Sequence, residues 1–161
     1  TDTIYGDSGA DVLYTGASLG TVYGGEGNDT IYFGGSGELF TTGTVNAIMS
    51  GGEGADEFSF ANNVGSNYAA TFTAAHVSAA SFATIADFSR GTDEISLYSM
   101  FATGVSPSVI NQDLTLASNN SISWTTSSGD TKVAIIGDSD EYLFLNLTGV
   151  TTLALTDFEI L

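Results

Sequence analysis

The sequence has no cysteine and almost no basic residues, and each absence excludes a class of chemistry. Without cysteine, the chain has neither disulfides nor thiolate metal sites. Arg90 and Lys132 stand against 19 acidic residues, which gives a formal net charge of −17. A chain of this charge cannot neutralise a phosphate backbone and is repelled by anionic lipid surfaces. We therefore expect no nucleic acid partner and no direct membrane insertion.

Long apolar runs and a catalytic histidine cluster are also missing. No segment approaches the roughly 18 apolar residues of a membrane span, and no signal peptide is visible at the N-terminus. His76 is the only histidine, and no His-Glu-x-x-His motif is present, so a zinc protease centre is excluded. The "GASLG" stretch at 16–20 matches a hydrolase nucleophile elbow, but it lies inside the repeat described below. We predict that the chain is not an enzyme.

What the chain does have is apolar residues and carboxylates. Hydrophobic residues make up 42% of the sequence and charged residues only 13%, which indicates a folded domain with a core. The natural partners of excess carboxylates are cations, and hard cations such as calcium prefer sites built only from oxygen. The composition therefore favours a calcium-binding protein.

A nine-residue repeat organises the first sixty residues. From Gly6 the chain divides without gaps into "GDSGADVLY" (6–14), "TGASLGTVY" (15–23), "GGEGNDTIY" (24–32), "FGGSGELFT" (33–41), "TGTVNAIMS" (42–50) and "GGEGADEFS" (51–59). The opening "TDTIY" matches the last five residues of such a unit. The eighth position is apolar every time, as Ile4, Leu13, Val22, Ile31, Phe40, Met49 and Phe58. Chance does not readily produce such a column, so the nonapeptide is a structural unit.

Each unit predicts a tight turn followed by a short strand. The glycine-rich first six residues permit positive φ, and the last three are too few for a stable isolated strand. Stacking the units points the apolar eighth residue inward. We therefore predict an all-β fold, a right-handed parallel β-roll with two nonapeptides, or 18 residues, per coil. Units 6–14, 24–32 and 42–50 then stack along one edge, and units 15–23, 33–41 and 51–59 along the other.

The stretches "GGEGND" and "GGEGAD", followed by "TIY" and "EFS", resemble the calcium-binding nonapeptide of RTX proteins. The resemblance implies several calcium ions between loops stacked one coil apart, held by backbone carbonyls and by the aspartate at position six. Carried over by position, the best-matched site has the carboxylates of Asp11 and Asp29 with carbonyls near Gly6, Ser8, Gly9, Gly24, Glu26 and Gly27. The corresponding residues of the last unit are Gly51, Glu53, Gly54 and Asp56.

Not every unit keeps the acidic position. Gly20 and Ala47 stand where the aspartate is expected, so we predict calcium on only some rungs. The opening "TDTIYG" also indicates that the chain is part of a longer precursor, and Asp2 is expected to complete a site with an upstream unit.

The segment after the repeats resembles the one that closes RTX β-rolls. In "TIADFSRGTDEISL" (84–97), the resemblance implies that Asp87 and Asp93 cap the final calcium rung opposite Asp56. Residues 61–83, rich in Ala, Ser, Asn and Thr, are predicted to form a loop or excursion with one short helix around 73–82.

From about residue 112 the pattern changes to alternation of apolar and polar residues. The stretches "SISWTT", "TKVAIIG", "EYLFLNLTG" and "TTLALTDFEIL", separated by turn residues, predict antiparallel strands that cap the end of the roll. The tail also resembles the C-terminal region of type I-secreted RTX proteins, which implies an uncleaved export signal. We therefore divide the chain into a calcium-binding roll (1–60), an excursion (61–83) and a closing rung, cap and secretion signal (84–161).

Two further patterns in the sequence each allow two interpretations. "GDSDEY" (137–142) is either a solvated acidic turn or a further calcium site. The ninth-position tyrosines, Tyr5, Tyr14, Tyr23 and Tyr32, either cover the sheet face or bind glycans or a partner.

Together these observations predict a bacterial, secreted or cell-surface module that folds on binding calcium after export by a type I secretion apparatus. The leading hypothesis is the C-terminal part of a surface-layer, matrix or other structural protein, with possible self-association into a lattice or filament. The alternatives are the non-catalytic C-terminal domain of a secreted protease or lipase, and the terminal domain of a large adhesin.

Overall fold

Two β-sheets make up nearly all of the computed structural model, in which residues 2–15, 20–33, 47–61, 83–98, 100–101, 106–111, 114, 120–137 and 142–161 are described. The strands of the eight-stranded sheet are, in spatial order, β1 (Asp2–Ser8), β3 (Gly20–Glu26), β5 (Ile48–Glu53), β7 (Ala83–Ile85), β12 (Tyr142–Leu147), β11 (Asp130–Ile136), β10 (Ser121–Ser127) and β9 (Ser108–Asn111). Those of the five-stranded sheet are β13 (Phe158–Ile160), β8 (Glu94–Tyr98), β6 (Glu57–Ala61), β4 (Thr30–Phe33) and β2 (Val12–Tyr14).

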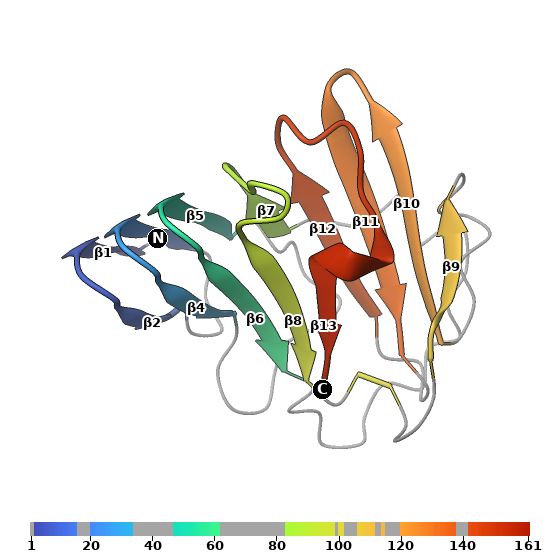
Figure 1. Ribbon diagram of the computed structural model, residues 1–161, viewed down its shortest axis with the longest axis horizontal. Helices are drawn as coiled ribbons and strands as arrows, with labels where there is room; N and C mark the ends of the chain where they lie inside the picture. The colour runs from blue at the N-terminus through green and yellow to red at the C-terminus, as the bar shows by residue number, and fades with distance from the viewer. Residues whose placement is uncertain are drawn as a thin grey trace.

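From β1 to β8, successive strands alternate between the two sheets, so this part of the chain winds as a roll (Figure 1). The strand pairs β1–β2, β3–β4, β5–β6 and β7–β8 are successive coils, and each strand pairs in parallel with its counterpart in the next coil. The predicted all-β fold with a parallel β-roll is confirmed.

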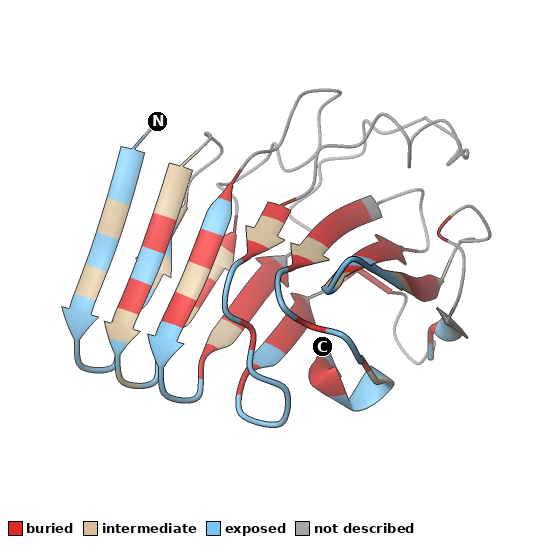
Figure 2. Ribbon diagram, turned by 90° about the horizontal axis from the view of Figure 1, so that it is seen from above, coloured by how far each residue is buried: buried red, intermediate tan, exposed pale blue. Residues whose placement is uncertain are grey.

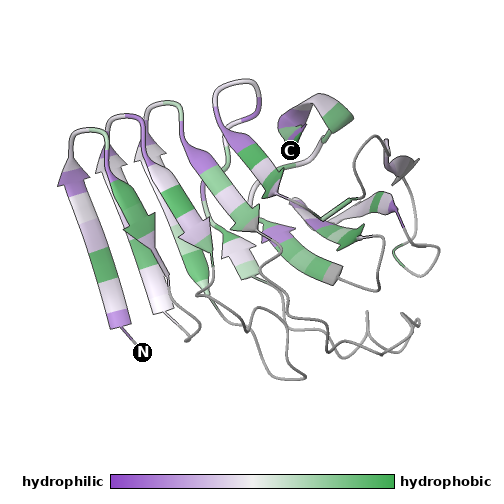
Figure 3. Cartoon of the chain, turned by 90° about the horizontal axis from the view of Figure 1, so that it is seen from below, coloured by the Kyte–Doolittle hydropathy of each residue, from purple (hydrophilic) through white to green (hydrophobic). Residues whose placement is uncertain are grey.

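The core lies between the sheets and is built from the eighth position of the repeat. Val22, Ile31, Met49 and Phe58 are each no more than 1% exposed, while Ile4 and Leu13 of the first coil are partly buried against them. Bands of buried residues alternate along the strands with bands of exposed or intermediate ones (Figure 2), as the two-residue period of a strand requires. The same strands carry alternating hydrophobic bands (Figure 3). The predicted inward column is confirmed for these residues, and Phe40 lies outside the described part of the chain.

The predicted spacing of 18 residues per coil is wrong after the second coil. β3 pairs with β5, with Val22 opposite Met49, and β4 pairs with β6, with Ile31 opposite Phe58. The last strand of unit 42–50 therefore joins that of unit 15–23 instead of that of unit 24–32. The step from the second coil to the third is 27 residues.

The glycine pattern of the loops explains this longer step. A Cβ at the fourth position of a stacked loop meets a backbone carbonyl, as a Cβ on Gly54 would meet the carbonyl of Gly27. "GGEGAD" keeps glycine at that position, whereas "TGTVNA" has Val45 there and Ala47 in place of the aspartate. Stacking "GGEGAD" on "GGEGND" is therefore sterically preferred even though it lengthens the connection, because loop length adds little entropy cost.

The C-terminal region continues the eight-stranded sheet. β10 and β11 form an antiparallel hairpin, and β12 is antiparallel to β11. However, β12 is parallel to β7, and β13 is parallel to β8, so these two strands form a last coil. The prediction of antiparallel strands is confirmed for β10–β12 and is wrong for the segment ending in β13. A parallel β13 covers the edge and core that β8 would otherwise expose.

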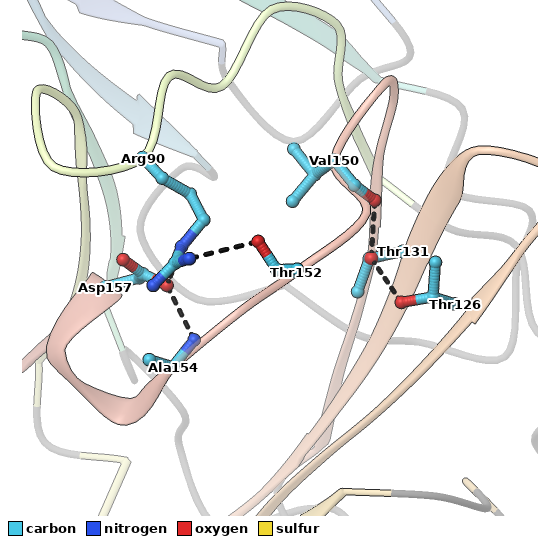
Figure 4. Close-up of polar contacts among 7 residues, drawn as sticks. All are labelled: Arg90, Thr126, Thr131, Val150, Thr152, Ala154 and Asp157. Atoms are coloured by element: carbon cyan, nitrogen blue, oxygen red, sulfur yellow. Dashed lines mark hydrogen bonds and ion pairs between the residues drawn. The ribbon is translucent and has the colours of Figure 1, made fainter.

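A polar latch holds the loop that leads into β13 (Figure 4). Arg90 donates from Nε to Asp157 Oδ2 at 2.7 Å and from Nη1 to Thr152 Oγ1 at 3.0 Å. The same Asp157 oxygen accepts the amide of Ala154 at 2.7 Å, at the start of the 3₁₀ turn η2 (Leu155–Asp157). The buried Asp157 carboxylate is thus paired with one of the two basic residues of the chain.

A designed disulfide tests the longer step between coils, because the natural chain has no cysteine. Tyr23 and Ser50 are partners across β3 and β5, and a disulfide spans Cα separations of about 4.4–6.8 Å. We expect Tyr23→Cys/Ser50→Cys to crosslink in calcium under mild oxidation, as measured by mass spectrometry and thiol titration. Tyr23→Cys/Thr41→Cys, the pair of an 18-residue coil, should keep both thiols free. Crosslinking of the second pair alone would reinstate the shorter coil.

Candidate metal centre

Three glycine-rich loops stack in a row along one edge of the roll, one loop in each of the first three coils. Loops 6–11, 24–29 and 51–56 connect the two strands of the first three coils, and Figure 2 shows them side by side. Backbone hydrogen bonds join neighbouring loops, with Gly9 N donating to Glu26 O at 2.8 Å and Gly27 N to Glu53 O at 2.7 Å. Each loop is therefore held by the next one along the roll.

The aspartates at position six form a continuous ladder through this row. Asp11 N donates to Asp29 Oδ1 at 2.8 Å, and Asp29 N donates to Asp56 Oδ1 at 2.9 Å. The ladder ends where Asp56 N donates to Asp93 Oδ1 at 3.2 Å, in the fourth coil. Each carboxylate thus caps an amide of the preceding coil, and Asp29, Asp56 and Asp93 are buried.

The second carboxylate oxygen of each repeat aspartate, unlike the oxygens that accept the ladder amides, has no hydrogen-bond partner among the described residues. The Oδ2 atoms of Asp11, Asp29 and Asp56 are buried and have no hydrogen-bond partner among the described residues. Asp11 Oδ2 and the carbonyl oxygen of Gly24 both lie beside Gly6, where a Cβ would stand. Asp29 Oδ2 and the carbonyl oxygen of Gly51 lie beside Gly24 in the same way.

Each of these two niches therefore places a carboxylate oxygen that has no hydrogen-bond partner among the described residues close to a backbone carbonyl oxygen. A buried acceptor that faces another acceptor costs free energy unless a donor or a cation compensates it. Within the described part of the chain, no three His, Cys, Asp or Glu side chains cluster to hold a metal. A cation here must therefore take backbone carbonyls in addition to a carboxylate. Calcium accepts six to eight oxygens of this mixed kind, so the niches fit calcium.

Glycine is required where the loops touch. Gly25 and Gly27 have φ of +119° and +123°, and a Cβ on either would overlap the carbonyl of Asp7 or of Gly9 in the coil below. Gly52 and Gly54 repeat this relation one coil further on. The glycines thus allow carbonyl groups of successive coils to approach one another, which side chains would prevent.

The structure brings most of the sequence-predicted ligand positions into this row. They are Gly6, Ser8, Gly9, Asp11, Gly24, Glu26, Gly27, Asp29, Gly51, Glu53, Gly54 and Asp56. Asp2 is not among them, because it begins β1 and lies at the end of that strand away from loop 6–11. Ser18, His76, Asp138, Asp140 and Glu141 lie outside the described residues, as does the helix predicted around 73–82.

Asp87 and Asp93 lie at the closing end of the row, but their oxygens are engaged by the protein. Asp87 accepts the amides of Gly51 and Gly52 at 3.0 and 2.9 Å and the hydroxyl of Ser50 at 2.6 Å. Asp93 accepts the amides of Asp56 and Ser89, the latter at 2.8 Å. Both carboxylates therefore cap backbone amides of the last stacked loop, a role that the nonapeptide pattern does not predict.

The repeat pattern of the sequence did not predict that the Asn28 side chain joins two neighbouring loops. Its Oδ1 accepts the amide of Ala55 at 3.0 Å and so ties two neighbouring loops together. The only available signal was its place at position five beside the glycines of "GGEGND", and position five varies among the units.

At the closing end of the row, burial and neighbouring negative charges both raise the pKa values of aspartate carboxyl groups. Burial raises the pKa of the Asp56 carboxyl above its ordinary 3.8, and the charges of Asp93, Asp29 and Asp87 raise it further, against a hydrogen bond from the Asp29 amide. Burial also raises the pKa of Asp93, with a contribution from Asp87, against the amides of Ser89 and Asp56. In the absence of a cation, these sites hold a proton more tightly than free carboxylates do.

Comparisons with known proteins agree with this geometry. The family model of the RTX calcium-binding nonapeptide repeat (4 copies) matches residues 1–18 and 21–37. Among solved structures, the chain is similar to the solution structure of the AlgE6R3 subunit from the Azotobacter vinelandii mannuronan C5-epimerase. The TM-score is 0.54 at 20% identity, over 98% of this chain and 77% of that chain. At this identity the likeness shows the fold. Comparison with curated proteins finds no match.

The fold and the row of loops define a calcium-binding β-roll module. More particularly, residues 1–18 and 21–37 match the RTX calcium-binding nonapeptide repeat, the repeat from which the first coils of the roll are built. Within the described residues, no helix is long and apolar enough to cross a membrane.

Gly27→Ala tests the close contact between loops. Its Cβ would overlap the carbonyl of Gly9, so we expect loss of the calcium-induced β signal in circular dichroism. Gly129→Ala is the matched control, because Gly129 also has positive φ, +93°, but has open space around it. Its cost should be limited to local strain of about 1–3 kcal/mol. Equal effects of the two variants would show that the loops are not in contact.

The raised pKa values of Asp56 and Asp93 predict a pH dependence of the calcium-free protein. The folded state holds these protons more tightly than the unfolded state, so its stability is greatest below the ordinary pKa of 3.8 and is lost as pH rises through the raised values. In chelator we expect more β structure at about pH 4.5 than at about pH 7 by circular dichroism. In excess calcium the order should reverse, because protons compete for the same oxygens. Rising β content with pH in chelator would contradict the shifts.

Proposed function

We propose that the chain is a non-catalytic, extracellular folding module whose roll forms when calcium binds between its loops. The observation that carries this proposal is the buried, unpartnered Oδ2 atom of Asp11, Asp29 and Asp56 in a row of glycine loops, within the described part of the chain. The first two aspartates would each supply a carboxylate oxygen, with carbonyl oxygens of Gly24 and Gly51 beside them.

The residues of the chain explain why folding and binding would be coupled. Carboxylates facing each other across a rung repel by about 3 kcal/mol at ~5 Å and an effective dielectric constant near 20. The loops also lose much backbone entropy on ordering, because they are rich in glycine. Bound calcium supplies the positive charge that offsets this repulsion. Binding free energy therefore becomes folding free energy, and the chain is extended at low calcium.

This coupling suits a protein that is exported unfolded and folds outside the cell. Extracellular sites of this kind typically have dissociation constants of about 10⁻⁴–10⁻³ M, well above intracellular calcium. We propose that residues 1–60 are the calcium-binding roll, 61–83 an excursion, and 84–161 a closing segment that also carries a type I export signal. In this proposal the parent is a bacterial surface-layer, matrix or other structural protein, with self-association into a lattice or filament.

A second candidate is the non-catalytic C-terminal domain of a secreted enzyme. It is favoured by the structural neighbour, which is a subunit of a mannuronan C5-epimerase. Intact mass of the natural product separates the two, because a mass near 16.5 kDa leaves no room for a catalytic domain. A calcium-dependent ordered array in electron micrographs would support the structural candidate, and a soluble product with an upstream catalytic domain would support the second.

Asp29→Asn tests the calcium-coupled folding. The asparagine keeps an oxygen to accept the Asp11 amide but removes the charge and presents an NH₂ group in the niche. We expect the calcium midpoint for β formation, followed by circular dichroism, to rise about tenfold or more. Asp7→Asn is the matched control, since Asp7 is exposed and its φ of 72° suits asparagine. An unchanged midpoint for Asp29→Asn, or equal β content in chelator and in calcium, would refute the proposal.

A further inference from the structure

A second group of oxygen atoms lies on the outer face of the five-stranded sheet. Glu57 of β6 is directly paired with Glu94 of β8, and Glu159 of β13 is paired with Ser96 of β8. Phe58 and Ile95, which directly follow Glu57 and Glu94, face the core. Because side chains alternate along a strand, the two glutamates point away from the core. Three glutamates from three adjacent strands therefore share one surface.

Two serines on the same face of the sheet, two residues along the strands from Glu57 and Glu94, are completely buried. Ser59 and Ser96 are paired across β6 and β8, and each is 0% exposed. Ser96 donates to Glu159 Oε2 at 3.4 Å. The Ser59 hydroxyl has no hydrogen-bond partner in the described part of the chain, although it lies on the same face as Glu57, two residues away. A buried hydroxyl without a partner is uncommon in folded proteins, and an oxygen-binding group beside it would satisfy it.

The two oxygens of the Glu57 carboxylate differ in their hydrogen bonds, as those of Asp29 and Asp56 do. Its Oε2 accepts the Thr30 hydroxyl at 3.5 Å, and the carboxylate also accepts the Tyr98 phenol. Its Oε1 is buried and has no hydrogen-bond partner among the described residues. The neutral donors Thr30 and Tyr98 hold the side chain in place, and one oxygen is left for a ligand.

No basic side chain of the described residues compensates this charge. Arg90 is paired with Asp157, and Lys132 belongs to β11 in the other sheet. Burial together with the charges of Glu159 and Glu57 raises the pKa of Glu94, which shows that the three carboxylates interact. The group therefore consists of hard oxygen atoms with an uncompensated negative charge.

We propose that Glu57 and Glu94, with the Ser59 hydroxyl on the same face and Glu159 on the neighbouring strand, bind a hard divalent cation, calcium, on the face of the five-stranded sheet. Carboxylates alone do not complete this site, since no three acidic side chains of the described residues converge on one point. Hydroxyls and water supply the remaining oxygens, as calcium readily accepts. The ion joins β6, β8 and β13 and so attaches the last strand to the roll.

This site is separate from the loop niches. Glu57 and Glu94 follow Asp56 and Asp93 directly in the chain, but they lie in strands, whereas the aspartates end the loops. The inference does not rest on the proposed function, because it depends on the sheet face alone. The site needs the folded roll, but it takes none of its ligands from the loops, so a roll that folds without ions in its loops can still have this site, and the reverse also holds.

Ion counting tests the proposal on the full chain. Native mass spectrometry or equilibrium dialysis at saturating calcium should give one ion fewer for Glu57→Gln/Glu94→Gln than for the natural protein, with the calcium-induced β signal retained. Glutamine preserves the hydrogen bonds from Thr30 and Tyr98. Asp7→Asn, which removes an exposed carboxylate elsewhere, should bind the natural number of ions. An equal number of ions in the natural protein and the double variant would overturn the proposal.

A measurement on the natural protein covers the case in which the double variant does not fold. Trace manganese(II) added to the calcium-loaded, isotope-labelled chain should broaden the amide signals of Ser59 and Ser96 at lower concentrations than those of Asp2 and Asp130, which lie outside the stacked loops. If the serine signals are broadened no sooner than those of the two reference aspartates, the sheet face attracts cations only through net charge and the site does not exist.

Discussion

The structure depends on one unfavourable arrangement, a buried carboxylate oxygen placed close to a backbone carbonyl oxygen, which occurs in two of the stacked loops. Asp11 Oδ2 beside the carbonyl of Gly24, and Asp29 Oδ2 beside that of Gly51, bring acceptor to acceptor. The inward apolar column provides a driving force for stacking the coils, but it also forces these oxygens together. A chain with 19 acidic and two basic residues has almost no cationic side chains to relieve them. These oxygens therefore suit an external cation such as calcium.

The candidate metal niches are consequently formed by the stacking of the coils itself. Each niche takes its carboxylate from one coil and its carbonyl from the next, so neither niche exists in an isolated nonapeptide. Glycine allows the close approach, since a Cβ on Gly27 would occupy the space of the Gly9 carbonyl. The first bond from loop to loop and the first complete niche then form together, which is the physical basis of cooperativity in a repeat protein.

The local rules of the repeat could be predicted from the sequence, and its long-range connections could not. The apolar column, with Ile31 and Phe58 at its centre, depends only on a period of nine, and so does the alignment of Asp11 with Asp29. The 27-residue step depends on which loop fits sterically on which, and a count of nines does not contain that information. The parallel placement of β13 likewise follows from the open edge of β8, a tertiary feature that overrides the alternation pattern.

The two ends of the aspartate ladder differ, and this difference gives the roll a direction. Both oxygens of Asp93 accept backbone amides, whereas Asp11, Asp29 and Asp56 each keep one oxygen without a partner in the described chain. The aspartate that ends the ladder in the closing coil, which the Arg90–Asp157 pair also fastens, is thus satisfied by protein groups alone. Order should therefore begin at the closing end, where the ladder itself requires no cation. It should then advance toward the N-terminus one loop at a time, because each new coil brings an acceptor that only a bound cation can satisfy.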